Sequence, residues 1–151
     1  MNRTSLPQPA QWRRQRGASL IEVMVALLVL TVSMLGVAAT QATALRNNQS
    51  SLERSQAVIA SYSILDAMRA NPTAARNNAY NMELTCSAPT GTGRIAVDQA
   101  RWINSLKADV GSAACGAINC SNGVCTVTVR WDESRALAGS STQSLTTVSR
   151  I

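Results

Sequence analysis

The chain has 151 residues, enough for one domain, and its composition excludes several classes of protein. It contains no histidine, the residue most often used in acid–base catalysis and metal binding. Four arginines within residues 1–17 supply most of the net charge of +6, which leaves +2 for the rest. The other arginines are scattered without interleaved aromatics, so we expect no nucleic-acid interface. Neither a catalytic triad nor a phosphate-binding loop is visible, and we therefore expect a non-enzymatic protein without a cofactor.

A polar, basic segment, residues 1–17, precedes a long apolar run. Its charged residues are Arg3, Arg13, Arg14 and Arg16. Glu22 is the only charged residue between Arg16 and Arg46. The apolar residues that follow Glu22 are numerous enough for a helix to cross the hydrocarbon core of a bilayer. Because a charged carboxylate at the centre of such a helix costs about 2.5–3.5 kcal/mol, and less near an interface, we expect Glu22 to have a charge partner.

The stretch Gly17-Ala18-Ser19-Leu20-Ile21-Glu22 lies between the basic segment and the apolar helix. It resembles the class III signal of type IV pilins and type II secretion pseudopilins. The resemblance implies that a prepilin peptidase cleaves after Gly17 and methylates the new N-terminus at Ala18. It also implies that the Glu22 carboxylate neutralises the terminal ammonium of a neighbouring subunit during filament assembly. Most members of the family have Phe at the position of Ala18, so this chain departs from the pattern there.

Two other interpretations of this region stay open. The basic segment and apolar run could form an ordinary secretory signal peptide, with Ala42-Thr43-Ala44 as its cleavage site. The Glu22 carboxylate could instead reach the membrane interface beside the arginines. Cleavage after Gly17 and cleavage before Leu45 give different mature N-termini, so N-terminal sequencing distinguishes the two kinds of signal.

The pattern after Gly17 predicts one helix from about Ala18 to Ala70, in two parts. Residues 18–45 are apolar all round and lack proline, which is typical of a membrane span or a filament core. Residues 46–71 form an amphipathic second half, and Asn71-Pro72 ends the helix. The residues expected on its apolar face are Leu52, Val58, Ile59, Tyr62, Leu65 and Met68.

The rest of the chain, residues 72–151, is expected to form a small head. Residues 72–94 are predicted to be a connector. Residues 97–110 are predicted to form a short helix with Asp98 as its N-cap. Its buried face would be formed by Trp102, Leu106 and Val110, which lie four residues apart. Residues 111–123 are rich in Gly, Ala, Ser and Cys and are expected to form a loop.

A hairpin signal follows this loop. Asn122-Gly123 is a strong turn pair, and residues 124–131 alternate between apolar and polar side chains. Cys125, Val127, Val129 and Trp131 are expected to point towards the core. Residues 145–151 predict a weaker final strand. The expected fold is therefore α+β, a type IV pilin fold in which three or four antiparallel strands pack on the second half of the long helix.

All four cysteines lie beyond the apolar run, on the side expected to be periplasmic, where disulfides persist. They are Cys86, Cys115, Cys120 and Cys125. Three pairings are possible; we favour Cys86–Cys115 with Cys120–Cys125, while a Cys115–Cys125 bond stays open. A zinc site is not expected, because the spacing is C-x4-C-x4-C and histidine is absent.

The C-terminal half adds a second resemblance. Asp98, Trp102 and Leu106, followed by a Val-Thr-Val-Arg-Trp strand at residues 127–131, resemble PilV-type minor pilins, the type IV pilus modification proteins. The resemblance implies a structural subunit that is anchored in the inner membrane and then incorporated into a pilus at the cell surface. Its implied partners are the major pilin, other minor pilins, the prepilin peptidase and the inner-membrane assembly platform. A type II secretion pseudopilin and a secreted binding protein remain alternatives.

Overall fold

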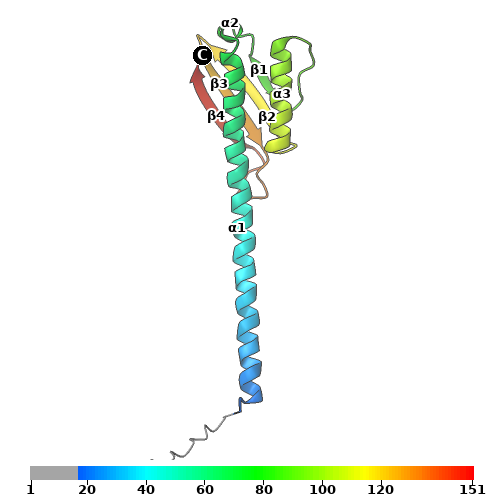
Figure 1. Ribbon diagram of the computed structural model, residues 1–151, viewed down its shortest axis with the longest axis vertical. Coiled ribbons are helices and arrows are strands. Elements are labelled where there is room, and N and C mark those ends of the chain that lie inside the picture. The colour runs from blue at the N-terminus through cyan, green and yellow to red at the C-terminus, as the bar shows by residue number, and fades with distance from the viewer. Residues whose placement is uncertain (1–16) are drawn as a thin grey trace, which may run out of the picture. The chain divides into compact units, whose positions relative to one another are not determined.

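The structure is a computed structural model, and it describes residues 17–151 (Figure 1). The described chain divides into two compact units, a first unit that ends at Ala39 and a second unit that spans residues 40–151. The elements in chain order are α1 (Leu20–Arg69), α2 (Pro72–Arg76), β1 (Met82–Thr85), α3 (Arg94–Asp109), β2 (Cys115–Ser121), β3 (Val124–Trp131) and β4 (Gln143–Arg150).

The described part of the first unit is the apolar beginning of α1. Every residue from Gly17 to Ala39 is exposed, and the helix continues through Gly36 without a break. Among residues 17–151, α1 is the helix that is long and apolar enough to cross a membrane. The continuous helix predicted from the absence of proline is therefore present. The predicted leader comprises residues 1–17, and all of it except Gly17 lies outside the described residues.

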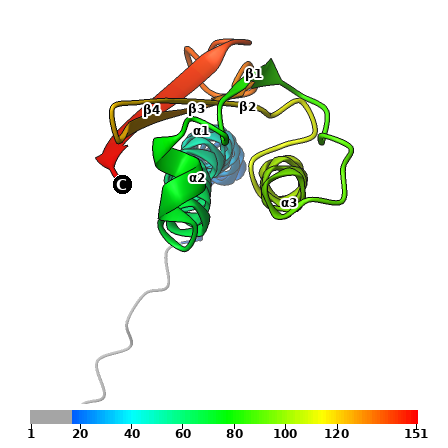
Figure 2. The ribbon, with the colours of Figure 1, turned by 90° about the horizontal axis from the view of Figure 1, so that it is seen from above.

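The second unit is a head in which a four-stranded antiparallel sheet packs against the later part of α1. The strands follow the order β1-β2-β3-β4, and Figure 2 shows α1 and α3 on the same side of this sheet. The core lies between the helices and the inner face of the sheet, as the α+β prediction required. Its largest buried side chains include Tyr80, Ile64, Leu65, Met68, Ile103, Leu106, Ile118, Val127 and Val129.

The hairpin of β2 and β3 follows the turn predicted at Asn122-Gly123. Both residues have positive φ, 51° and 76°, the conformation that a two-residue turn of this kind needs. The alternation predicted for residues 124–131 is confirmed, because Cys125, Val127, Val129 and Trp131 are all buried.

The loop predicted for residues 111–123 is wrong, because Cys115–Ser121 form strand β2. Small residues have a low intrinsic preference for strands, which hid β2 in the sequence. In the structure β2 pairs along its whole length with β3, and Gly116 provides the space in which the Trp102 ring lies. Tertiary contacts therefore decide the conformation of this segment.

The connector predicted for residues 72–94 also contains regular structure. Pro72 begins the short helix α2, a position where its missing N–H costs nothing. Strand β1 then pairs with β2 through Met82↔Ile118 and Thr85↔Gly116, with a shift of register between the two pairs. Both elements are too short to produce a period that can be recognised in the sequence.

Helix α3 begins four residues before Asp98, so the prediction that Asp98 is the N-cap is wrong. The N-cap is Gly93. Ile95, in the first turn, packs against the core and extends the helix in this direction. The Asp98 carboxylate instead accepts a hydrogen bond of 2.9 Å from the hydroxyl of buried Tyr80. The predicted burial of Trp102, Leu106 and Val110 is confirmed.

The face of α1 that packs on the sheet differs from the predicted apolar face. Of the six residues predicted for that face, Leu65 and Met68 are buried, but Leu52, Ile59 and Tyr62 are more than half exposed. The buried residues of α1 are Ala57, Ala60, Ser61, Ile64, Leu65 and Met68. Small residues on this face allow close approach, and the Trp102 indole N–H donates a hydrogen bond of 3.0 Å to the carbonyl of Ala60.

The close contact between Gly116 and Trp102 yields a stability prediction. A Cβ atom on Gly116 would lie 2.5 Å from the Trp102 ring. We therefore expect Gly116→Ala to lower the free energy of unfolding by about 1–3 kcal/mol, the usual cost of overpacking. The measurement is chemical denaturation of the detergent-solubilised chain, followed by tryptophan fluorescence. The matched control is Asn119→Ala, which introduces the same side chain at an exposed position of the same strand. Equal stability of the two variants would contradict this account of β2.

Candidate functional site

The predicted cleavage junction lies just before α1. Gly17, Ala18 and Ser19 are exposed and not helical, and α1 begins at Leu20. The carbonyl of Ser19 accepts a hydrogen bond of 3.2 Å from the N–H of Val23, which is the start of the helical pattern. A peptidase can bind an exposed, non-helical segment in extended form. Cleavage after Gly17 would leave two residues ahead of the helix.

Glu22 lies in the first turn of α1, and its side chain is exposed. A carboxylate at this end of a helix interacts favourably with the unpaired N–H groups, by about 0.3–1 kcal/mol. Within residues 17–151, none of the ion pairs involves Glu22. The carboxylate is therefore accessible to a cation from outside the described part of the chain.

The described residues of the first unit present a continuous apolar surface. Large side chains that are about half exposed or more recur from Leu20 to Val37, and no charged residue follows Glu22 among them. Soluble monomeric proteins rarely expose an apolar patch of this size. This surface therefore requires lipid or the helices of other proteins as its surroundings.

In the second unit, α1 carries a further line of exposed apolar residues, which we call the outer stripe. It consists of Leu45, Leu52, Ile59 and Tyr62, each between 51% and 69% exposed. Leu45, Leu52 and Ile59 are seven residues apart and so lie on nearly the same side of the helix. The residues that pack on the sheet lie on the opposite side, so the head leaves the outer stripe uncovered.

Comparison with known protein families identifies the N-terminal region. Residues 12–38 match the family described as the prokaryotic N-terminal methylation motif. This match supports a type IV pilin-like family. It indicates a precursor that is processed by prepilin peptidase, and pilins of this kind are structural subunits rather than enzymes. Together with the apolar helix, the motif indicates membrane anchoring before assembly into a pilus with other pilins.

The pilin-like match ends before the second unit begins. It therefore does not distinguish a minor pilin from a pseudopilin. No curated protein and no solved structure matched the chain.

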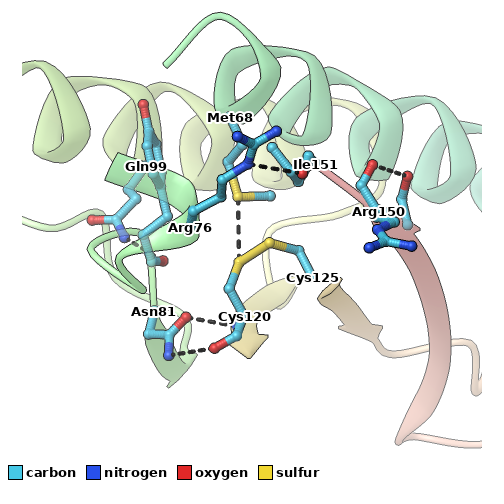
Figure 3. Close-up of a disulfide and its surroundings, with 10 residues drawn as sticks. Met68, Arg76, Asn81, Gln99, Cys120, Cys125, Arg150 and Ile151 are labelled. Carbon is cyan, nitrogen blue, oxygen red and sulfur yellow. Dashed lines mark hydrogen bonds between the residues drawn. A yellow bond between two sulfur atoms is a disulfide. The ribbon is translucent and has the colours of Figure 1, made fainter. Parts of the chain in front are cut away.

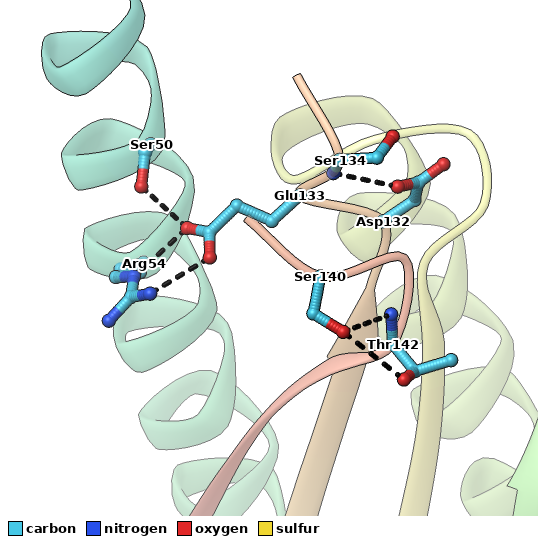
Figure 4. Close-up of polar contacts among 7 residues, drawn as sticks. All are labelled: Ser50, Arg54, Asp132, Glu133, Ser134, Ser140 and Thr142. Carbon is cyan, nitrogen blue, oxygen red and sulfur yellow. Dashed lines mark hydrogen bonds and ion pairs between the residues drawn. The ribbon is translucent and has the colours of Figure 1, made fainter. Parts of the chain in front are cut away.

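The head contains an ion pair that the sequence analysis did not find. Glu133, in the loop between β3 and β4, is 2% exposed and reaches α1 (Figure 4). Its carboxylate accepts hydrogen bonds from Arg54 Nε at 2.9 Å, Arg54 Nη2 at 2.8 Å and Ser50 Oγ at 2.6 Å. The hydrogen bond from Arg54 holds the pKa of Glu133 below its usual value, despite the burial of the carboxyl group. We call Ser50, Arg54 and Glu133 the α1 clasp, because they fix this loop to the helix.

A cavity of about 800 Å³ lies beside the α1 clasp, between α1 and the loops at residues 110–114 and 132–136. Charged groups of both signs line it, including Arg46, Glu53 and Arg135. Within residues 17–151 there is no group of side chains suited to a metal ion. The lining therefore does not single out one class of ligand.

The four cysteines form two disulfides, Cys86–Cys115 and Cys120–Cys125, the pairing that we favoured from the sequence. Cys120 and Cys125 are direct partners in the β2–β3 hairpin, and both are buried. Figure 3 shows this bond beneath Met68, whose sulfur lies 3.8 Å from Cys120 Sγ. The Cys86–Cys115 bond joins the end of β1 to the start of β2 and closes a loop that contains α3.

The α1 clasp yields a pH prediction. Because the pKa of Glu133 is lower in the folded chain than in the unfolded chain, the clasp stabilises the fold above the unfolded value of about 4.3. This stabilisation is lost as the pH falls below that value and through the folded pKa. We expect Glu133→Gln to lower stability at neutral pH and to weaken its dependence on pH below about 4.3. The measurement is the free energy of unfolding against pH.

The control for the α1 clasp is Glu83→Gln, which changes an exposed carboxylate in β1. This variant should keep the wild-type pH dependence. A Glu133→Gln chain with the same acid-induced loss of stability as the wild type would show that the clasp does not contribute.

Proposed function

We propose that this chain is a minor pilin of the PilV type, a non-enzymatic subunit of a type IV pilus. Residues 1–17 are its leader, residues 18–45 its membrane span and later filament core, and residues 46–71 the second half of its spine. Residues 72–151 form the greater part of a periplasmic head. The single observation that carries this proposal is the outer stripe, an exposed line of apolar side chains on the part of α1 that belongs to the second unit.

The length of α1 explains why the outer stripe needs a protein partner. A helix rises about 1.5 Å per residue, so about 20 residues cross the hydrocarbon core. Ile59 and Tyr62 lie far beyond that number of residues from Leu20, the start of α1. Because about 20 residues fill the hydrocarbon core, lipid tails do not account for the outer stripe, whereas helices of neighbouring subunits can cover it. Packing of α1 against other helices would therefore bury the side chains that the head leaves exposed.

The N-terminal charges would set the register of that packing. Cleavage after Gly17 gives Ala18 a terminal ammonium, and Glu22 lies in the first turn of α1. In an apolar filament core an isolated charge is costly, so an ammonium and a carboxylate from adjacent subunits favour the one axial position where they meet. Methylation at Ala18 would keep the positive charge of this group.

The proposed assembly route follows from the leader, the apolar helix and the N-terminal charge pair. The prepilin peptidase processes the chain at the inner membrane, and the assembly platform then incorporates it with the major pilin and other minor pilins. Its role would be to prime assembly, as part of a tip complex, and thereby to support motility, adhesion or DNA uptake.

A type II secretion pseudopilin is the second candidate, because it would use the same leader and spine. The two disulfides and the strand that ends at Trp131 favour the pilus. A deletion strain separates the candidates. Loss of twitching motility with normal secretion supports the minor pilin, and loss of secretion with normal motility supports the pseudopilin.

A secreted binding protein with an ordinary signal peptide is the third candidate. The methylation-motif match at residues 12–38 supports cleavage at Gly17 instead. A mature chain that starts at Ala18 agrees with the pilin proposal, and one that starts at Leu45 excludes it.

The proposed charge pair makes a prediction for Glu22→Ala. We expect cleavage to remain normal, because the junction at Gly17 is unchanged. Incorporation into pili should fall by about a hundredfold or more, since an unpaired buried charge costs about 3–5 kcal/mol. The measurements are the mass of the mature N-terminus and immunoblots of sheared pili. Normal incorporation of this variant would exclude the proposed role of Glu22.

The outer stripe makes a separate prediction. Ile59→Glu should reduce incorporation into pili and leave the stability of the head within about 0.5 kcal/mol, because Ile59 is 60% exposed. The matched control is Asn104→Glu, which places the same charge on an exposed site of α3. Immunoblots of sheared pili and of whole cells give the incorporated fraction. Equal incorporation of the two variants would show that the outer stripe is not an assembly surface.

A further inference from the structure

The two disulfides differ in their access to solvent. Cys120 and Cys125 are 1% and 0% exposed and lie in the core between the sheet and α1. Cys86 is exposed, directly after β1, whereas its partner Cys115 is 3% exposed. A thiolate from solution can therefore reach Cys86 but none of the other three cysteines.

The buried sulfur of the exposed bond has a cationic neighbour. Arg130 Nη2 lies 3.9 Å from Cys115 Sγ, because Arg130 and Cys115 are direct partners in the β2–β3 ladder. A guanidinium at this distance stabilises a thiolate and so makes Cys115 a better leaving group. The carbonyl of Ala113 lies 3.3 Å from the same sulfur and can accept the S–H of the protonated form.

We propose that Cys86–Cys115 is a thiol-exchange site for low-molecular-weight thiols, whereas Cys120–Cys125 is a closed structural bond. An attacking thiolate forms a bond with Cys86 Sγ as the Cys86–Cys115 bond breaks. The electron pair leaves on Cys115 Sγ, beside Arg130. A second thiol then attacks the mixed disulfide and releases Cys86 as a thiolate. The reductant becomes a disulfide, and the protein bond gains two electrons and, according to pH, up to two protons.

Opening this bond has a defined structural consequence. Strand β1 is short, and its ladder with β2 contains a shift of register. The Asn81 side chain holds the start of β1, through hydrogen bonds of 2.7 Å and 3.2 Å to the backbone of Cys120. The disulfide holds the other end, next to Thr85. Reduction should therefore release the end of β1 and the segment between β1 and α3, and leave the β2–β3 hairpin intact.

The experiment uses the full chain in detergent, without denaturant. Limited dithiothreitol is followed by alkylation and peptide mass mapping. We expect Cys86 and Cys115 to be alkylated at least about tenfold faster than Cys120 and Cys125, because exchange rates follow access to the sulfur. When glutathione is the thiol, the mixed disulfide that it forms with the protein should be on Cys86 rather than on Cys115. Equal alkylation of all four cysteines, or glutathione on Cys115, would overturn the proposal.

Arg130→Gln tests the cationic neighbour. We expect reduction of Cys86–Cys115 to slow about threefold or more, because the leaving thiolate loses its counter-ion. Arg150→Gln is the matched control, since it removes an arginine from the neighbouring strand β4 and should leave the rate unchanged. Arg130→Lys should restore most of the rate. A wild-type rate in Arg130→Gln would show that the positive charge has no part in the exchange. These measurements need no pilus, so their outcome is independent of the proposed function.

Discussion

The head depends on one buried contact, in which Trp102 of α3 lies between α1 and the sheet. The indole N–H donates to the carbonyl of Ala60, and the ring covers the backbone of β2 at Gly116. A side chain on Gly116 would displace the ring, and a larger residue than Ala60 would move α1 away from it. Helices α1 and α3 and strand β2 therefore meet only because α1 and β2 carry small residues, Ala60 and Gly116, at the places where α3 carries Trp102.

Because of this contact, the two apolar sides of α1 have different surroundings: one packs on the sheet and the other remains exposed. The side that packs on the sheet includes small residues, Ala57, Ala60 and Ser61, beside larger ones such as Leu65. The outer stripe carries larger side chains, and they remain exposed in the isolated chain. A helix that had only to support a head would not need the second side. The folded head therefore uses one side of α1 for its own stability and leaves the other for partners.

The loops of the head are fixed by polar and covalent bonds rather than by apolar packing. The α1 clasp holds the loop between β3 and β4, where Gly139 has no room for a side chain because the carbonyl of Glu133 occupies that space. The two disulfides fix the β2–β3 hairpin and the end of β1. A small head buries little apolar surface, so such bonds contribute a large share of its stability. These bonds also differ in their access to solvent, because Glu133 and Cys120 are buried while Cys86 is exposed.

The leader motif, the continuous apolar helix, the Asn122-Gly123 turn and strand β3 could all be predicted from the sequence, because each depends on neighbouring residues or on a regular period. Strand β2, the start of α3 and the α1 clasp could not. Cys115–Ser121 become a strand only because β3 and Trp102 lie beside them, and Arg54 meets Glu133 across 79 positions of the chain. The two apolar sides of α1 show the same limit. Their periodicity can be read from the residues, but it does not say which side the sheet covers, because that choice depends on the fit of Trp102 against Ala60 in the folded chain.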